Sequence, residues 1–251
     1  MFALNAFSLT KLFTSNTQWL EKQQTSINSA AAVIALANAF SIVFGFIRNR
    51  IILSYFSEEI ATAWILAFQI PDMLFQILVF GALSASFIPI FLSVHAEKNP
   101  QTAFKMSAIV LNILLLFFGT MSAIVFVFAE PLTQWRIGNK IDTEQIVIII
   151  QLTRIMLAAQ VLFTISNVMT GILQSYKRFI IPSIAPIIYN LGIIASVVLF
   201  SGMFGIYAAG IGVVIGALAH LLIQLPLAIK IGFRPIFSLD FKYPGVMRLF
   251  L

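Results

Sequence analysis

The sequence predicts an all-α protein, a polytopic membrane helix bundle with about six transmembrane helices. Three observations lead to this fold class. Hydrophobic residues make up 60% of the 251 residues and charged residues only 10%, and the mean hydropathy is +1.01. A water-soluble domain cannot bury that much apolar surface. Uncharged apolar stretches long enough for a crossing recur along the chain, and the connections between them are short and polar.

The first 24 residues differ from the rest of the chain. Phe2, Leu9 and Phe13 fall on one face of a helix, and Trp19 and Lys22 are typical of a membrane surface. The segment is too short and too polar to span a bilayer, and no small-residue cleavage site follows a clean apolar core. Residues 1–24 are therefore predicted to form an amphipathic helix lying on the membrane, with a disordered leader as the alternative.

Residues 25–231 are predicted to form the transmembrane domain. Its expected spans are Asn28–Tyr55, Ala61–Val94, Ala103–Phe128, Gln145–Tyr176, Pro182–Phe200 and Ile206–Ile231. The second span is long for a straight crossing. We expect Pro71 and Pro89 to kink it, because each removes a backbone donor.

The remaining segments are predicted to lie between or after the spans. Residues 130–144 are expected to be a polar connection. Residues 232–251 are expected to be a cytoplasmic linker followed by the start of a seventh span, in a chain that continues beyond Leu251.

The basic residues predict the orientation. They occur singly between apolar runs, which is typical of a multispanning protein and argues against nucleic-acid binding despite a net charge of +6. One side of the predicted membrane carries Lys11, Lys22, Lys98, Lys105, Lys177, Arg178, Lys230, Arg234, Lys242 and Arg248. The other side carries Arg48, Arg50, Arg136, Lys140 and Arg154. The excess on the first side places the N-terminus in the cytoplasm.

No pattern of catalytic residues is present in the sequence. There is no Cys, and the two His residues, His95 and His220, are far apart, so we expect neither a metal nor another cofactor. Paired carboxylates, a nucleophile with a neighbouring base and a Gly-rich phosphate loop are also missing from the sequence. The polar residues are mostly amides and single arginines, which suit the binding of a ligand and not its chemical conversion.

The first span carries a polar face around Arg48. Asn38, Ser41, Gly45 and Arg48 are three, four and three residues apart, which is helical spacing. A guanidinium in hydrocarbon costs about 2.5–3.5 kcal/mol on insertion scales, so it normally faces protein or water. We predict that Arg48 faces a cavity and binds an anionic substrate. The alternative is that Arg48 reaches the outer headgroups, as we expect of Arg50.

The second span carries the only carboxylate predicted to lie well inside the membrane. Gln69, Asp72 and Gln76 share one helical face. A carboxylate at this depth needs a partner, a proton or water, and Arg48 is the obvious candidate partner. Asp72 and Gln76 are therefore predicted cavity residues, and a purely structural ion pair or a carboxylate reaching the interface is the alternative.

The fourth span has the longest polar stripe. Its members lie four, three, four and three residues apart and are Gln160, Thr164, Asn167, Gly171 and Gln174. Arg154 lies near the outer end, on nearly the same face. We predict that the stripe, with Gln160, Asn167 and Arg154, lines a water-filled substrate cavity, and polar contacts between helices are the alternative. The sixth span carries Ala208, Gly212 and Gly216, a small-residue ridge continued by His220 and Gln224 that predicts close helix packing.

Several stretches resemble the MurJ/MviN family, bacterial lipid II flippases of the multidrug/oligosaccharidyl-lipid/polysaccharide exporter superfamily. In the family's order, they are GFIRNR (45–50), FQIPD (68–72), FGALSASFIPIF (80–91), YKRFIIPSIAPIIYN (176–190), FGIY (204–207) and QLPLAIKIG (224–232). The resemblance implies a multi-pass protein of the bacterial cytoplasmic membrane that moves the undecaprenyl-pyrophosphate-linked peptidoglycan precursor, lipid II, outward by alternating access. It also implies that the chain is one lobe of a two-lobed exporter fold, completed by a C-terminal lobe or by a second copy.

The resemblance also assigns roles to individual residues. Arg48 matches a family arginine that lines the central cavity and is thought to meet the pyrophosphate, and Asp72 and Gln76 match polar cavity positions. The chain departs from the family pattern at Ile42, at Asn49 and at the pair Phe75-Gln76, where many members carry charged residues. The implied cavity has therefore lost charge of both signs.

Three alternative functions remain at this point. A related exporter could carry an O-antigen or polysaccharide lipid, or, in the cation-coupled drug exporters, a cationic substrate that favours acidic cavity residues. A membrane-embedded polyprenyl-phosphate enzyme would need clustered acids or a metal motif in a loop. A non-transporting scaffold would carry a fused partner-binding segment, which is not seen in this sequence.

Overall fold

The computed structural model describes residues 23–24, 26–77, 86–137 and 141–249. Within these ranges the protein is built from α2 (Ile27–Tyr55), α3 (Glu58–Gln76), α4 (Phe87–Glu97), α5 (Pro100–Val127), α6 (Ala129–Ile137), α7 (Thr143–Ser175), α8 (Ile180–Phe204), α9 (Tyr207–Lys230) and the 3-10 turn η3 (Met247–Leu249). No strand occurs in this part of the chain. The all-α fold class is thus confirmed.

Five of the described helices are long and apolar enough to cross a membrane, namely α2, α5, α7, α8 and α9. They coincide with five of the six predicted spans. The sixth prediction, Ala61–Val94, falls on α3 and α4, and residues 78–85 between them lie outside the described ranges.

Local sequence signals explain several helix ends. The side chain of Asn99 caps α5 by accepting from the backbone N–H of Thr102 at 2.8 Å, and Pro100 follows at the first helical position, where its missing N–H has no partner to lose. α8 ends at Gly205, whose φ of +55° is in the left-handed region that favours glycine.

One predicted detail is wrong. Pro89 does not kink a long helix; it is the third residue of α4, inside the first turn, where backbone N–H groups have no helical acceptor anyway. The polar connection predicted for residues 130–144 also contains the short helix α6. Its residues are too polar for a spanning helix, which is why hydropathy alone gave no signal there.

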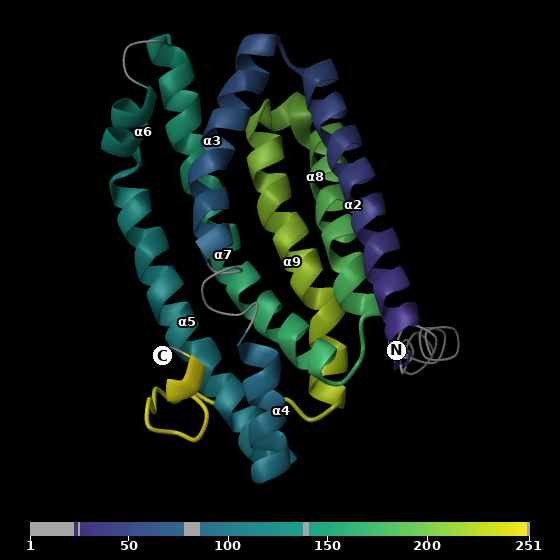
Figure 1. The fold of residues 1–251 in the computed structure, drawn as a ribbon. Coiled ribbons are helices and arrows are strands. Elements are labelled where there is room, and N and C mark those ends of the chain that lie inside the picture. The colour runs from purple at the N-terminus through teal and green to yellow at the C-terminus, as the bar shows by residue number, and fades with distance from the viewer. Residues whose placement is uncertain (1–22, 25, 78–85, 138–140, 250–251) are drawn as a thin grey trace, which may run out of the picture.

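The helices are arranged in a bundle with α9 near its middle (Figure 1). α7 and α3 lie on one side of α9, α8 and α2 on the other, and α5 and α6 lie beyond α7. Half of the most apolar window of α7 and of α9 is buried, but only 11% of that of α2. α2 therefore lies at the edge of the bundle, with large apolar side chains such as Phe40 and Phe46 exposed.

The small-residue ridge of α9 forms a close helix contact, as predicted. A Cβ added at Gly216 would lie 2.5 Å from the carbonyl oxygen of Tyr189, and one at Gly212 would lie 2.8 Å from Cα of Ile193. Both contacts are with the backbone of α8, so α8 and α9 approach at a distance that only glycine permits at these positions.

Chain segments outside the spans are also held to the bundle. The predicted amphipathic helix falls on residues 1–24, of which only residues 23 and 24 are described. Gln24 is buried, donates its backbone N–H to the carbonyl of Lys177 and accepts the N–H of Phe179 on its side chain. After α9, Asn112 of α5 donates to the carbonyls of Ile236 and Ser238. The predicted seventh span stays a prediction.

Candidate functional site

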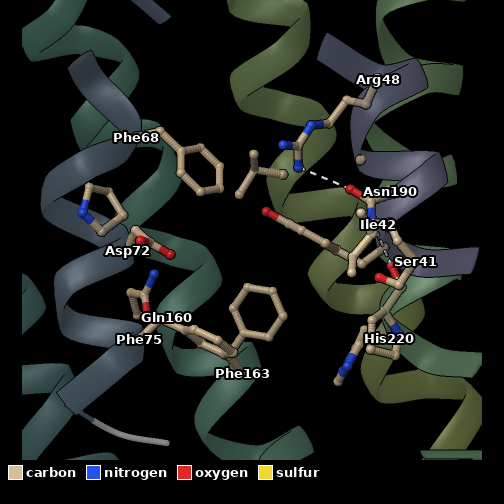
Figure 2. Close-up of a pocket in the computed structure, with 15 residues that line it drawn as sticks. Ser41, Ile42, Arg48, Phe68, Asp72, Phe75, Gln160, Phe163, Asn190 and His220 are labelled. Atoms are coloured by element: carbon tan, nitrogen blue, oxygen red, sulfur yellow. Dashed lines mark hydrogen bonds between the residues drawn. The ribbon is translucent and has the colours of Figure 1, made fainter. Parts of the chain in front are cut away.

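A cavity of about 430 Å³ lies between five helices, and Arg48 is one of the residues that line it. α2 contributes Ser41, Ile42, Gly45 and Arg48; α3 contributes Phe68, Pro71, Asp72 and Phe75; α7 contributes Gln160 and Phe163; α8 contributes Pro186, Tyr189 and Asn190; α9 contributes Val213 and His220. Figure 2 shows the α3 residues facing those of α2 across the cavity. The polar face predicted for the first span therefore reaches this cavity at three of its four positions, and the fourth, Asn38, is exposed.

The guanidinium of Arg48 lies in the cavity, and hydrogen bonds hold two of its nitrogens. Its Nη1 donates to Oδ1 of Asn190 at 3.0 Å, and its Nε donates to Oδ1 of Asn49 at 3.1 Å. The guanidinium also lies 5.7 Å from the ring centre of Phe68, within the range of a cation–π contact. Within the described residues its Nη2 has no hydrogen-bond acceptor. One edge of the guanidinium thus remains available for a ligand.

Asn190 links two helices at this point. Besides accepting from Arg48, it donates from Nδ2 to the carbonyls of Ser41, at 3.3 Å, and Pro186, at 3.1 Å. It is 6% exposed. Asn190 is not among the predicted site residues, because a single amide in an apolar helix carries no signal until α8 is known to pack on α2.

Asp72 lies across the cavity from Arg48 and does not pair with it (Figure 2). Its Oδ2 accepts from Nε2 of Gln76 at 2.7 Å, one turn further along α3. The predicted Arg48–Asp72 ion pair is therefore wrong: the amide of Asn190 takes the place of the carboxylate. The two charges face the same space without neutralising each other by contact.

The predicted stripe on α7 reaches the cavity only at Gln160. Thr164 donates its hydroxyl to the backbone carbonyl of Gln160, and Asn167 donates to that of Phe163. A Cβ at Gly171 would lie 2.6 Å from the ring of Phe87 in α4. The prediction that this stripe lines a wet cavity is thus wrong beyond Gln160, because the polar groups bond to their own helix and allow close packing.

Arg154 lies away from the cavity of Arg48. Its Nε donates to the carbonyl of Phe126 in α5 at 3.1 Å, and its guanidinium lies 5.4 Å from the ring centre of that residue. The reason is geometric. At 3.6 residues per turn, positions six apart on a helix differ by about 120° in direction, so Arg154 and Gln160 face different neighbours. Gln76 also lies outside the cavity wall and touches the site only through Asp72.

A buried polar network holds the wall formed by His220. Oγ of Ser166 lies 2.6 Å from Nδ1 of His220 and accepts from Nε2 of Gln224 at 2.8 Å. The hydroxyl of Thr170 donates to Oε1 of Gln224 at 2.7 Å. The network joins α7 to α9 and fixes the orientation of the imidazole at the cavity. The prediction that His220 and Gln224 belong to a packing ridge is confirmed.

Comparisons with known proteins match this chain to one family. The family model described as lipid II flippase MurJ matches residues 52–251. The chain belongs to the MurJ family of lipid II flippases. This family comprises transporters and not enzymes. The match begins four residues after Arg48, at Ile52, so the arginine is placed at the cavity by the structure and not by the family model.

Individual relatives support the assignment. The chain is 30% identical over 202 residues to a probable lipid II flippase MurJ from Borreliella burgdorferi, covering 80% of this chain and 39% of that protein. It is 28% identical over 220 residues to one from Buchnera aphidicola subsp. Acyrthosiphon pisum, covering 86% and 43%. The chain thus spans about two fifths of the length of these MurJ relatives.

A solved structure shows the same fold. The chain superimposes on lipid II flippase MurJ in an inward closed conformation with a TM-score of 0.69 and 21% sequence identity, covering 87% of this chain and 46% of that one. This similarity confirms a MurJ-like helical membrane fold.

Proposed function

We propose that this chain is the first lobe of a protein that flips undecaprenyl-pyrophosphate-linked peptidoglycan precursor, lipid II, outward across the bacterial inner membrane by alternating access. The N-terminus then lies in the cytoplasm, as the distribution of basic residues predicts. A second lobe, supplied by the rest of the protein or by a second copy, completes the pathway, and membrane lipids surround both lobes.

The observation that supports this proposal is the state of Arg48. It lies on a membrane-spanning helix, faces a cavity and has no carboxylate partner among the described residues. A guanidinium binds pyrophosphate oxygens through charge-assisted, often bidentate hydrogen bonds. The bond to Asn190 holds one terminal nitrogen and leaves the other for the ligand. The cavity therefore suits an anionic headgroup.

A cation-coupled drug exporter is the less favoured alternative. A cationic substrate needs acidic groups, and Asp72 is the one carboxylate among the described residues of the cavity wall. One of its oxygens already accepts from Gln76. An uncompensated arginine in the same cavity also repels a cation.

The test is a complementation and transport experiment with Arg48 variants of the complete protein. Arg48→Ala is expected to abolish outward movement of the precursor, measured as its accessibility to a reagent added outside the cells. Arg48→Lys keeps the charge but not the fork of donors, so it should impair transport more than folding. Arg50→Ala is the matched control, because Arg50 is exposed on the same helix outside the cavity. Wild-type export by Arg48→Ala contradicts the proposal.

A further inference from the structure

The end of the cavity away from Arg48 contains hydrogen-bonding groups that the protein does not satisfy. Gln160 is 4% exposed, yet its buried Oε1 has no partner. Asp72 accepts from Gln76 on Oδ2, and its Oδ1 has no donor within the described ranges. Buried polar groups are normally paired, and an unpaired one costs free energy. An unpaired amide in the wall of a cavity therefore indicates a ligand group that completes it.

The same end of the cavity has aromatic walls. The rings of Phe75 and Phe163 meet edge to face with centres 4.9 Å apart, and Phe163 meets Tyr189 in the same way at 5.2 Å. Phe75 is partly exposed, so its ring retains surface for a ligand. Figure 2 shows Phe75, Phe163 and Gln160 toward one end of the cavity and Arg48 with Asn190 toward the other.

We propose that Asp72, Gln160 and the Phe75–Phe163 pair form a subsite for one sugar ring that carries hydroxyl and acetamido groups. The proposal rests on the proposed function, because the sugar belongs to the ligand whose pyrophosphate meets Arg48. A carboxylate oxygen accepts from sugar hydroxyls, and a glutamine amide pairs with hydroxyl or acetamido groups. The C–H face of a pyranose packs against an aromatic ring. Asp72 and the partly exposed ring of Phe75 line this part of the cavity, and the unpaired amide oxygen of Gln160 is buried in its wall.

The chemistry favours a sugar over the other groups that could satisfy these atoms. A peptide segment also bonds to carboxylates and amides, and the sugar-bearing test ligand below therefore carries no peptide. A bound cation does not need the phenyl rings as packing surfaces. The volume of about 430 Å³ is near the lower end of ligand pockets, which run from about 300 to 1,000 Å³, and suits one ring rather than a whole glycopeptide.

The experiment compares two ligands on the complete protein in lipid nanodiscs. One is undecaprenyl pyrophosphate, and the other is the same lipid carrying an N-acetylated disaccharide without peptide. Dissociation constants are measured for the wild type, Arg48→Gln, Asp72→Asn and Gln160→Met, of which the last keeps the side-chain length but forms no amide hydrogen bonds. Gln174→Met is the matched control, because Gln174 lies on the same helix about 21 Å further along its axis, at 1.5 Å per residue, and outside the cavity wall.

The proposal makes separate predictions for the two ligands. Asp72→Asn and Gln160→Met should weaken binding of the glycolipid about 3- to 30-fold and change binding of the sugar-free lipid less than about twofold. Arg48→Gln should weaken both. Gln174→Met should change neither. If Gln160→Met lowers the melting temperature, Phe75→Leu replaces it, because that change removes an aromatic face and no hydrogen bond.

The two proposals fail in different ways. If Arg48→Gln leaves binding of undecaprenyl pyrophosphate unchanged, the proposed function is wrong. If Arg48→Gln weakens both ligands but Asp72→Asn and Gln160→Met affect both equally, or neither, the sugar subsite is overturned and the function stands.

Discussion

Substitutions of Asn190 test the structure most directly. They change the contact that positions the Arg48 side chain and leave the charge of Arg48 in place. Replacing Asn190 by Leu removes the bonds to Arg48 and to the carbonyl of Ser41, which join α8 to α2. A bond to a charged group contributes about 1.5–3 kcal/mol and a neutral bond between membrane helices about 0.6 kcal/mol. The sum predicts a loss of about 2–3.6 kcal/mol in the free energy of unfolding, reduced by any new contacts of the leucine.

The measurement is a double-mutant cycle with Arg48→Gln and Asn190→Leu, read from reversible unfolding in mixed micelles. If the two side chains act together, the coupling free energy should reach about 1 kcal/mol or more. Additive effects, with coupling near zero, would show that the hydrogen bond at 3.0 Å contributes nothing and would refute the assignment of Asn190 as a positioning residue.

Asn190→Asp gives the complementary result. The carboxylate keeps the shape of the amide and forms an ion pair with Arg48, but it loses the bonds that Nδ2 donates to the carbonyls of Ser41 and Pro186. The ion pair offsets part of that loss, and the pyrophosphate has to compete with the carboxylate for the guanidinium. Affinity for undecaprenyl pyrophosphate is expected to fall at least about tenfold, which corresponds to about 1.4 kcal/mol. Wild-type affinity in this variant would mean that Arg48 does not meet the anion.

Two further predictions concern packing and the arginine outside the cavity. Gly216→Ala places a Cβ against the α8 backbone and should lower stability by about 1–3 kcal/mol, measured by thermal unfolding, whereas Gly119→Ala, with open space around it, should not. An unchanged melting temperature for Gly216→Ala would contradict the close helix contact. Arg154→Gln should change affinity for undecaprenyl pyrophosphate less than about twofold, because its guanidinium bonds to the carbonyl of Phe126. A loss comparable to that of Arg48→Gln would place Arg154 in the binding site after all.

The sequence predicted the spanning helices because hydropathy and length depend on one segment at a time. It also predicted that Ser41, Gly45 and Arg48 share a face, since helical spacing needs no knowledge of neighbours, and the cavity confirms that face. Arg154 shows the limit of the same rule. A shift of one position along α7 changes the direction of a side chain by about 100°, and the side chain then meets a different helix.

The sequence could not predict which side chains on different helices bond to each other. Arg48 bonds to Asn190 and not to Asp72, although an ion pair was the simplest expectation for two charges at membrane depth. Arg48 bonds to Asn190 because α8 packs against α2, and the two residues are 142 positions apart in the sequence. Similarly, Gln160, Thr164 and Asn167 look equivalent as a stripe. Only the packing of α7 distinguishes the one that reaches the cavity from the two that bond to their own backbone.

Different hydrogen bonds hold the two ends of the cavity. Arg48 lies on α2, an edge helix whose most apolar window is only 11% buried, and Asn190 ties it to α8, which is locked to α9 at Gly212 and Gly216. Asp72 and Gln160 lie on α3 and α7, which are joined where the Thr153 hydroxyl donates to the carbonyl of Ala67. The anion end and the sugar end thus rest on different hydrogen bonds, although the network of Ser166, His220 and Gln224 also joins α7 to α9 at the cavity wall. Arg48→Gln and Asp72→Asn each remove a hydrogen bond of one end only, and that difference allows the two-ligand experiment to distinguish the two subsites.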